Sequence, residues 1–360
     1  MRTKFNIGKH CVGPDQPTYF IADIAANHDG DLERAKDLIH MGAEVGVNAA
    51  KFQNFTADTL VSDIGFKSLD SNNTHQANWK KSVFEMYDEA SIPIKWCKEL
   101  KQTCDDVGID YFTSLYDLGG LPHISPYVSA WKIGSGDITW HDLIEKFSSD
   151  GKPILLATGA SEMREVSAAM NVILRNTSEV VLMQCNTNYT GSSDNFRHIE
   201  LNVLKTFAEQ FPQSVLGLSD HTPGHATVLG AVALGARVIE KHFTDDPLRE
   251  GSDHSFSMSP KTWRDMVERT RELEFALGQT EKKIMSNEVE TRIVQRRCAR
   301  ATVDMEVGVV ITKEHLCFLR PSPNDSISPC DSDFLIGKKL KRSMKKGQHF
   351  DRSFIKSENA

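Results

Sequence analysis

Two histidines follow or end short apolar runs, and their side chains are the strongest candidates for chemistry in this chain. His221 follows the run VLGLSD, and His242 ends the run VIEKH. Neutral imidazoles bind Mn, Zn and Fe readily, so both side chains are candidate ligands of a divalent metal. Two ligands leave the other coordination positions to water and substrate, which is typical of a catalytic site. The alternative is a pair of hydrogen-bonded structural histidines.

Two lysines indicate an anionic ligand. Lys51 and Lys132 lie in apolar runs of a chain that is acidic overall, with 42 Lys and Arg against 49 Asp and Glu. A buried lysine is costly unless it is paired, so the two ammonium groups predict a pocket for phosphate or carboxylate. One alternative is that Lys132 forms a Schiff base with its substrate, as in aldolases. Another is that both lysines are solvated.

These residues need a scaffold that brings distant parts of the chain to one place. Eight short, mostly apolar runs are expected to be strands, and helical patterns alternate with them. The expected strands are 20–26, 49–53, 110–116, 130–135, 153–159, 180–186, 215–221 and 238–243. The expected helices include 31–45, 90–107, 161–173, 222–234 and 259–277. Eight such units predict an α/β fold of the (β/α)8 TIM barrel type, in preference to an open doubly wound sheet.

In a TIM barrel the active site lies at the C-terminal ends of the strands. The polar side chains at or just after these ends are Asp23, Lys51, Gln53, Ser114, Tyr116, Lys132, Ser135, Asn186, Thr187, Tyr189, Ser219, His221, Glu240 and His242. A long polar stretch, 54–90, follows the second strand on the same face. We expect it to cover the substrate; the alternative is a surface elaboration without function.

The chain changes character after its last barrel helix. We expect a catalytic barrel over 1–280, a charged linker over 281–296 and a small, mostly β domain over 297–360, where short β-type runs are broken by Gly and Pro. The basic run over 338–346 lacks interleaved aromatic residues and is expected to be a solvated face.

Composition excludes several classes of protein. The 360 residues carry a net charge of −7, which argues against a nucleic-acid-binding protein. No apolar run approaches the ~18 residues of a membrane span, and no secretory signal is visible. The seven cysteines form no C-x-x-C pair. We therefore expect reduced thiols in a cytoplasmic protein.

Several motifs together resemble the sialic acid synthase family. They are FIADIAANHDGD, AAKFQ, WKIGSGDI, PILLATGA, GLSDHT and GARVIEKHFTDD with EGSDHSFSM, and they occur in the order in which that family carries them. The last ~60 residues resemble the small antifreeze-like (SAF) domain of these synthases, including the step from Arg320 to Pro321. The resemblance covers essentially the whole chain.

The resemblance implies a reaction and an assembly. The family condenses phosphoenolpyruvate with an N-acetylated hexose, such as N-acetylmannosamine or a 2,4-diacetamido-trideoxyhexose. The products are phosphate and a nine-carbon 2-keto acid of the sialic, legionaminic or pseudaminic type. The implied cofactor is Mn²⁺, with Mg²⁺ or Co²⁺ as alternatives. The implied assembly is a homodimer in which the SAF domain lies over the partner barrel and Arg320 reaches into it.

The resemblance also assigns roles to individual residues. His221 and His242 match the metal ligands, and Asp23 matches a catalytic carboxylate. The expected phosphoenolpyruvate pocket contains Lys51, Gln53, Ser114, Lys132, Ser135, Asn186 and Ser219. Tyr189, Glu240 and Asp253 are expected around the sugar and a metal-bound water, with Glu240 also a catalytic candidate, and Tyr116, Thr158 and Thr187 are further substrate contacts.

Some positions depart from the family pattern. Asp23 replaces the usual Glu, and Ala157 lacks a hydroxyl that Thr158 is expected to supply. Gln184 stands where a His is usual, and the segment after Arg320 reads RPSPN in place of R-P-G-x-G. Because of these changes, a further alternative is that the chain is a sugar-binding protein that has lost catalysis.

Overall fold

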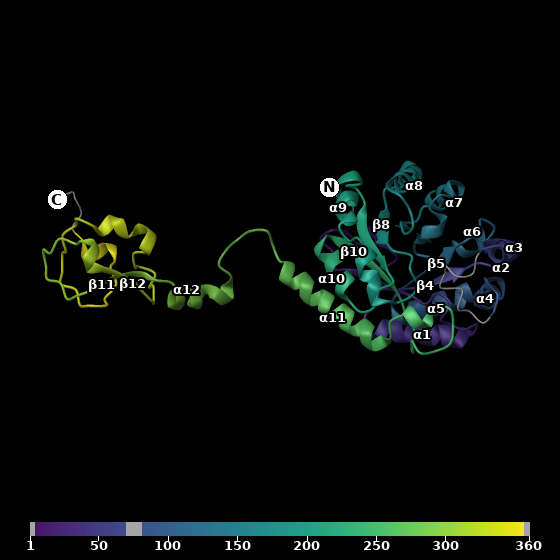
Figure 1. Ribbon diagram of the computed structural model, residues 1–360, viewed down its shortest axis with the longest axis horizontal. Coiled ribbons are helices and arrows are strands. Elements are labelled where there is room, and N and C mark those ends of the chain that lie inside the picture. Colours follow the sequence, from purple (N-terminus) through teal and green to yellow (C-terminus); the bar gives the residue numbers. More distant parts are fainter. Residues whose placement is uncertain (1–3, 70–80, 356–360) are drawn as a thin grey trace. The chain divides into compact units, whose positions relative to one another are not determined.

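A closed barrel of eight parallel strands forms the centre of the N-terminal part of the chain (Figure 1). The computed structural model describes residues 4–69 and 81–355. The strands are β3 (Tyr19–Asp23), β4 (Ala49–Asn54), β5 (Asp110–Leu115), β6 (Trp131–Ile133), β7 (Ile154–Ala157), β8 (Val180–Cys185), β9 (Val215–Asp220) and β10 (Ala236–His242). Each strand pairs with the next along the chain, and β10 pairs with β3 to close the ring. The predicted TIM barrel is confirmed.

The barrel strands are apolar on both faces because helices cover the outside and side chains fill the inside. Every residue of β7 and β9 is buried. Gly217 in β9 shows how tightly the interior is packed. A Cβ at this position would lie 2.9 Å from side-chain carbons of Met183 and Val181 on the neighbouring strand. Only glycine fits there without displacing β8.

Helices follow the strands and pack around the barrel (Figure 1). They are α1 (Leu32–Glu44), α5 (Trp96–Val107), α6 (Leu121–Ile124), α7 (His141–Ser148), α8 (Met163–Asn176), α9 (Val203–Gln210), α10 (Ala226–Ala233) and α11 (Pro260–Leu277). Asp31 caps α1 by accepting hydrogen bonds from the backbone of Glu33 and Arg34. The expected helix 90–107 begins only at Trp96, because Pro93 disfavours helix before it.

Two further features surround the barrel. A short antiparallel hairpin, β1 (Phe5–Ile7) and β2 (His10–Val12), precedes β3. Beside it, at the N-terminal ends of the strands, the Asp110 carboxylate accepts hydrogen bonds from Tyr19 Oη at 2.9 Å and His10 Nδ1 at 2.7 Å. The long stretch after β4 contains α2 (Ala57–Leu60), α3 (Asp63–Lys67) and α4 (Val83–Ala90); its residues 70–80 lie outside the described part of the chain.

The chain divides into two compact units, residues 1–278 and 279–360. The second unit has a hydrophobic core of its own, in which Ile311, Leu335, Leu340 and Phe350 are fully buried. Its regular elements are α12 (Val289–Gln295), β11 (Cys298–Ala301) and β12 (Leu316–Leu319). It contains less strand than expected, because Gly and Pro interrupt its β-type runs and leave isolated bridges and 3₁₀ turns.

Short 3₁₀ helices complete the described elements. They are η3 (Ser135–Asp137), η4 (Ser193–His198), η5 (His254–Phe256), η6 (Ser286–Glu288), η7 (Lys313–His315), η8 (Pro329–Leu335) and η9 (Arg352–Phe354). Among the residues with a described structure, no helix combines the length and the apolar character needed to cross a bilayer.

Candidate active site at the barrel mouth

Two lysines and two carboxylates meet inside the barrel, near the C-terminal ends of the strands. Lys51 Nζ lies 2.7 Å from Asp23 Oδ2 and 3.7 Å from Glu240 Oε1. Lys132 Nζ lies 2.6 Å from the same Glu240 oxygen. All four side chains are at most 4% exposed, so the alternative of solvated lysines is wrong. Charges buried this deeply persist only when they compensate one another, as these four do.

The two carboxyl groups of this cluster differ in acidity. Burial raises the pKa of Glu240, but Lys132 and Lys51 outweigh that effect and lower the pKa to about 2. Burial raises the pKa of Asp23 above its usual value, although Lys51 opposes the rise. Glu240 is therefore a fixed anion near pH 7, whereas Asp23 takes up a proton more readily. Neighbouring carboxyls whose pKa values are pushed apart are typical of acid–base sites.

His221 directly follows β9 and His242 ends the adjacent β10, and their ring centroids lie 5.4 Å apart. His221 Nδ1 donates a hydrogen bond to the backbone oxygen of Asn186 at 2.8 Å, which leaves Nε2 for another partner. His242 Nε2 lies 3.5 Å from Asp23 Oδ2. Burial is the main cause that lowers the pKa of both imidazoles to about 4. Both rings are therefore neutral near pH 7, as a metal ligand must be.

The donor atoms at this point suit a divalent cation. Asp23 Oδ1, Glu240 Oε2 and His242 Nδ1 are buried and have no hydrogen-bond partner among the described residues. Unsatisfied buried polar atoms are expensive, and a bound cation or one of its water ligands would supply a partner to such an atom. Imidazole and carboxylate ligands are suited to Mn, Zn or Fe. The residue types at the barrel mouth therefore suit a divalent metal, although among the described residues only Asp325, His349 and Asp351 bring three ligand atoms within 4.8 Å of one another.

Aromatic rings shield the histidines on one side. The Tyr189 ring lies 4.5 Å from that of His221, and the Phe256 ring lies 4.8 Å from that of His242, both measured between centroids. These rings lower the local dielectric, which strengthens every charge interaction in the site. Phe256 was not among the sequence candidates, because it lies on η5, well beyond the end of β10.

A cavity of about 450 Å³ lies at the barrel mouth, and its lining includes His242 but none of the four residues of the ion cluster. The predicted residues that line it are Gln53, Tyr116, Ser135, Tyr189, His242 and Asp253. Met86, Tyr87 and Ala90 at the end of α4 form another wall, so the stretch after β4 does contribute to the cavity. This volume lies within the usual range of pockets for small molecules.

Several predicted contacts have their polar groups engaged elsewhere. Thr158 Oγ1 donates to the backbone oxygen of Met183 at 2.9 Å, so its proton does not replace the hydroxyl missing at Ala157. The Asn186 amide donates to the backbone oxygen of His198 at 3.1 Å. Neither residue is among those that line the cavity.

The remaining predicted residues have different surroundings. Ser219 Oγ donates to Glu240 Oε1 at 3.1 Å, and Ser114 Oγ is buried without a partner among the described residues. Thr187 lies beside the backbone of Gly159, where an added Cβ would approach its methyl group to 2.5 Å. Arg320 is exposed and belongs to the second unit.

Asp137 is a cavity-lining carboxylate that the sequence analysis missed. It ends η3, four residues after β6, and burial raises its pKa to about 6. Its position within the WKIGSGDI motif was the available signal. The side chain was passed over because it lies beyond the strand end on which the prediction concentrated.

We expect Asp137→Asn to stabilise the protein at high pH. The folded-state pKa of about 6 exceeds the ordinary value of 3.8, so ionisation costs stability as the pH rises from 3.8 through 6. The neutral amide avoids that cost. The free energy of unfolding, measured with urea, should rise by roughly 2 kcal/mol at pH 8 and stay unchanged at pH 4. Equal free energies of unfolding for the wild type and Asp137→Asn at pH 8 would show that ionisation of Asp137 does not cost stability.

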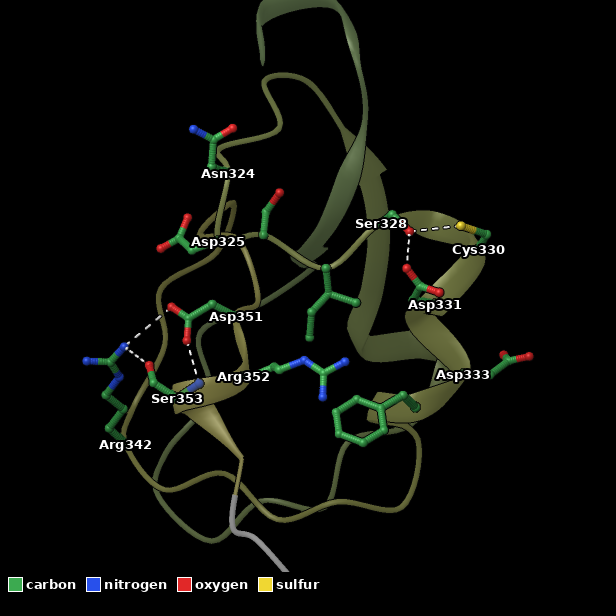
Figure 2. Close-up of a pocket in the computed structure, with 13 residues that line it drawn as sticks. Asn324, Asp325, Ser328, Cys330, Asp331, Asp333, Arg342, Asp351, Arg352 and Ser353 are labelled. Carbon is green, nitrogen blue, oxygen red and sulfur yellow. Dashed lines mark hydrogen bonds and ion pairs between the residues drawn. The ribbon is translucent and has the colours of Figure 1, made fainter. Parts of the chain in front are cut away.

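The second unit holds a larger cleft, of about 1030 Å³, in which Arg342 and Asp351 form an ion pair (Figure 2). Arg342 reaches Ser353 Oγ at 2.6 Å and Asp351 Oδ2 at 3.6 Å. Asp325, His349 and Asp351 bring possible ligand atoms within 4.8 Å of one another. Because the Asp351 carboxylate already faces Arg342 and accepts the Ser353 amide, we place the reacting site in the barrel.

Several known proteins are similar to this chain in sequence or in fold. The sequence profile of the NeuB family matches residues 38–282. The N,N'-diacetyllegionaminic acid synthase of Legionella pneumophila is 32% identical, over 93% of this chain and 94% of its own. The pseudaminic acid synthase of Helicobacter pylori is 29% identical, over 92% and 95%. The solved N-acetylneuraminic acid synthetase of Leptospira borgpetersenii serovar Hardjo-bovis is 26% identical, with a TM-score of 0.70 over 81% of this chain and 95% of that one.

Proposed function

Because this chain belongs to the NeuB family, among whose members are sialic, legionaminic and pseudaminic acid synthases, we propose that it condenses phosphoenolpyruvate with an N-acetylated hexose. The products are a nine-carbon 2-keto sugar acid and phosphate. The observation that carries the proposal is the buried cluster of Lys51, Lys132, Asp23 and Glu240 beside a facing pair of histidines. It combines cationic groups for an anionic substrate with carboxylates for proton transfer.

The lysines bind and orient phosphoenolpyruvate in this proposal. Its carboxylate and phosphate attract the ammonium groups of Lys51 and Lys132, which meet only compensating carboxylates in the described structure. The C3 atom of phosphoenolpyruvate forms a bond to the aldehyde carbon of the open-chain sugar. Holding both reactants in one enclosed cleft supplies a large proximity advantage.

Asp23 is the base that we propose for the next step. Bond formation leaves cationic character at C2 of the former phosphoenolpyruvate, and water must add there. The Asp23 carboxylate accepts one proton from that water, and this proton goes to the alkoxide oxygen that was the aldehyde oxygen. The C–O bond to phosphate then breaks as the C2 hydroxyl becomes a carbonyl, and the proton of that hydroxyl leaves with the phosphate. A pKa raised by burial brings this carboxyl closer to the working pH, which favours proton transfer.

His221 and His242 are the proposed metal ligands, with Mn²⁺ as the expected ion and Mg²⁺ or Co²⁺ as alternatives. A bound divalent ion supplies a Lewis acid that polarises the sugar aldehyde. The neutral imidazoles and the unsatisfied carboxylate oxygens of the described structure support this assignment.

The test is phosphate release from phosphoenolpyruvate in the presence of Mn²⁺ and a panel of N-acetylated hexoses, including N-acetylmannosamine. We expect release only when both substrates and the metal are present. No release with any hexose would overturn the proposal. Trapping of a substrate on Lys132 by borohydride would favour the Schiff-base aldolase. Tight sugar binding without turnover, with activity restored by Asp23→Glu, would favour a sugar-binding protein that has lost catalysis.

We also propose a homodimer in which the second unit completes the partner's site through Arg320. Its separate core and the charged segment before it support an element of this kind. Arg320→Ala and His242→Ala should each be inactive alone. A refolded equal mixture should recover about a quarter of wild-type activity, because half of the dimers then hold one complete site. An inactive mixture would show that Arg320 does not act across subunits.

A further inference from the structure

A second buried ion pair lies directly behind the two histidines and joins β9 to β10. Asp220 precedes His221, and Lys241 precedes His242. The two residues are paired neighbours in the sheet, and Lys241 Nζ contacts Asp220 Oδ2. Their side chains are 0% and 2% exposed. Buried charges of this kind require a compensating environment, which the pair provides.

The pair faces away from the barrel interior. Side chains alternate between the two faces of a strand. Ser219 and Glu240 meet inside the barrel, where Ser219 Oγ donates to Glu240 Oε1 at 3.1 Å. The next residue along each strand, Asp220 or Lys241, therefore points outward toward the helices. The pair cannot contact a substrate in the cavity, so any effect it has on catalysis must be indirect.

Lys241 contacts the residues on both sides of His221 in the sequence. Its ammonium group contacts the Asp220 carboxylate and also donates to the backbone oxygen of Thr222 at 2.5 Å. The Asp220 carboxylate accepts further hydrogen bonds from Thr222 Oγ1 at 2.9 Å and from Thr227 Oγ1 of α10 at 2.7 Å. Lys241, which precedes His242, therefore belongs to one buried network with both sequence neighbours of His221.

A gain in the stability of the folded protein does not by itself explain such a network. A buried ion pair adds little compared with well-packed apolar residues of the same size, because desolvation offsets the attraction. The pair has a stronger effect on geometry. The ammonium group contacts two acceptors, the Asp220 carboxylate and the Thr222 backbone oxygen, so the spacing of the two strand ends can vary little. The separation of the two imidazoles, 5.4 Å between centroids, depends on that spacing.

We propose that Lys241 and Asp220 are positioning residues that set the distance and orientation of His221 and His242 for a divalent cation. The cation itself rests on the proposed function. Loss of Lys241 should therefore weaken metal binding in the protein that remains folded, in addition to the stability that is lost when a buried pair is broken. We also expect that kcat falls at limiting metal while the KM for phosphoenolpyruvate changes little, since the lysines of the ion cluster remain in place.

The test compares Lys241→Met and Lys241→Arg in the full chain with Asp110→Asn as a matched control. Asp110 is also a buried, multiply hydrogen-bonded carboxylate, but it lies at the opposite end of the barrel. Mn²⁺ affinity is measured by electron paramagnetic resonance of the free ion, and stability by urea unfolding. We expect Lys241→Met to raise the Kd for Mn²⁺ by about 10- to 100-fold. Lys241→Arg should recover most of the affinity, and Asp110→Asn should lose stability with an unchanged Kd.

An unchanged Kd in folded Lys241→Met would overturn the proposal and leave the pair a structural role. If Lys241→Met does not fold, Asp220→Asn gives the same comparison. If the wild-type protein binds no Mn²⁺, the metal assignment fails separately. The positioning role is then judged from the ¹⁵N signals of the two imidazoles, which report the Nδ1 hydrogen bond of His221. Signals unchanged by the substitution would overturn it.

Discussion

Replacing His242 by alanine should abolish Mn²⁺ binding and lower kcat/KM by about three orders of magnitude. The substitution removes one of two neutral imidazoles in a site where Lewis-acid polarisation of the aldehyde is worth several kcal/mol. His221→Ala should have the same effect, since a single remaining imidazole holds the ion weakly. The measurements are a Mn²⁺ titration and steady-state kinetics of phosphate release.

The matched control is His10→Asn. His10 also hydrogen-bonds a buried carboxylate, but at the N-terminal end of the barrel, far from the cavity. It should bind Mn²⁺ and turn over as the wild type does. Full activity of His242→Ala in the presence of a chelator would show that the paired histidines are structural.

The second large effect is expected at Lys132, whose loss should damage both substrate binding and the fold. Lys132→Met leaves the Glu240 carboxylate buried without its nearest cation. Breaking a buried pair in this way costs about 3–5 kcal/mol of unfolding free energy at neutral pH. The KM for phosphoenolpyruvate should rise as well, because one of its two proposed cationic partners is absent.

The pH dependence of this loss follows from Glu240. In the wild type, the lysines hold its pKa at about 2, below the ordinary 4.5, so its contribution to stability is present above pH 4.5 and lost as the pH falls through 2. Without Lys132 the balance reverses, and ionisation of Glu240 becomes costly. The difference in stability between wild type and variant should therefore grow from pH 4 to pH 8.

A double variant separates the two effects. Lys132→Met with Glu240→Gln removes both charges, so it should recover much of the stability while activity stays lost. Urea unfolding at several pH values, together with phosphate release, makes the comparison. Equal stabilities of the single and double variants would mean that Glu240 does not depend on Lys132 in the folded protein.

The sequence predicted the barrel and much of its mouth for a simple reason. Continuous apolar runs with polar ends are typical of parallel strands buried on both faces, and a barrel gathers their C-terminal ends. His221 and His242 were therefore expected to converge, and they do. The two lysines were expected to meet for the same reason, and Lys51 and Lys132 share Glu240.

The remaining features depend on tertiary structure that no local pattern specifies. Lys132 and Glu240 are 108 positions apart, and only closure of the barrel makes them neighbours. Phe256 and Asp137 enter the site from 3₁₀ turns, which lack a periodic signal. The strands of the β1–β2 hairpin have three residues each, too few for an alternating pattern to stand out.

The outward pair behind the histidines was missed for another reason. Asp220 and Lys241 were not among the sequence candidates. Strand alternation alone places them on the outer face, opposite His221 and His242. Their mutual pairing follows from the register between β9 and β10, which the structure supplies.

Mass spectrometry of the reaction product tests the proposed chemistry of the barrel mouth most directly. The protein is incubated with phosphoenolpyruvate, Mn²⁺ and each N-acetylated hexose in turn, with His242→Ala as the control. We expect one hexose to yield a nine-carbon 2-keto acid, in equal amount to the phosphate released, and His242→Ala to yield none. Pyruvate without a new carbon–carbon bond, or the same product from His242→Ala under a chelator, would contradict it.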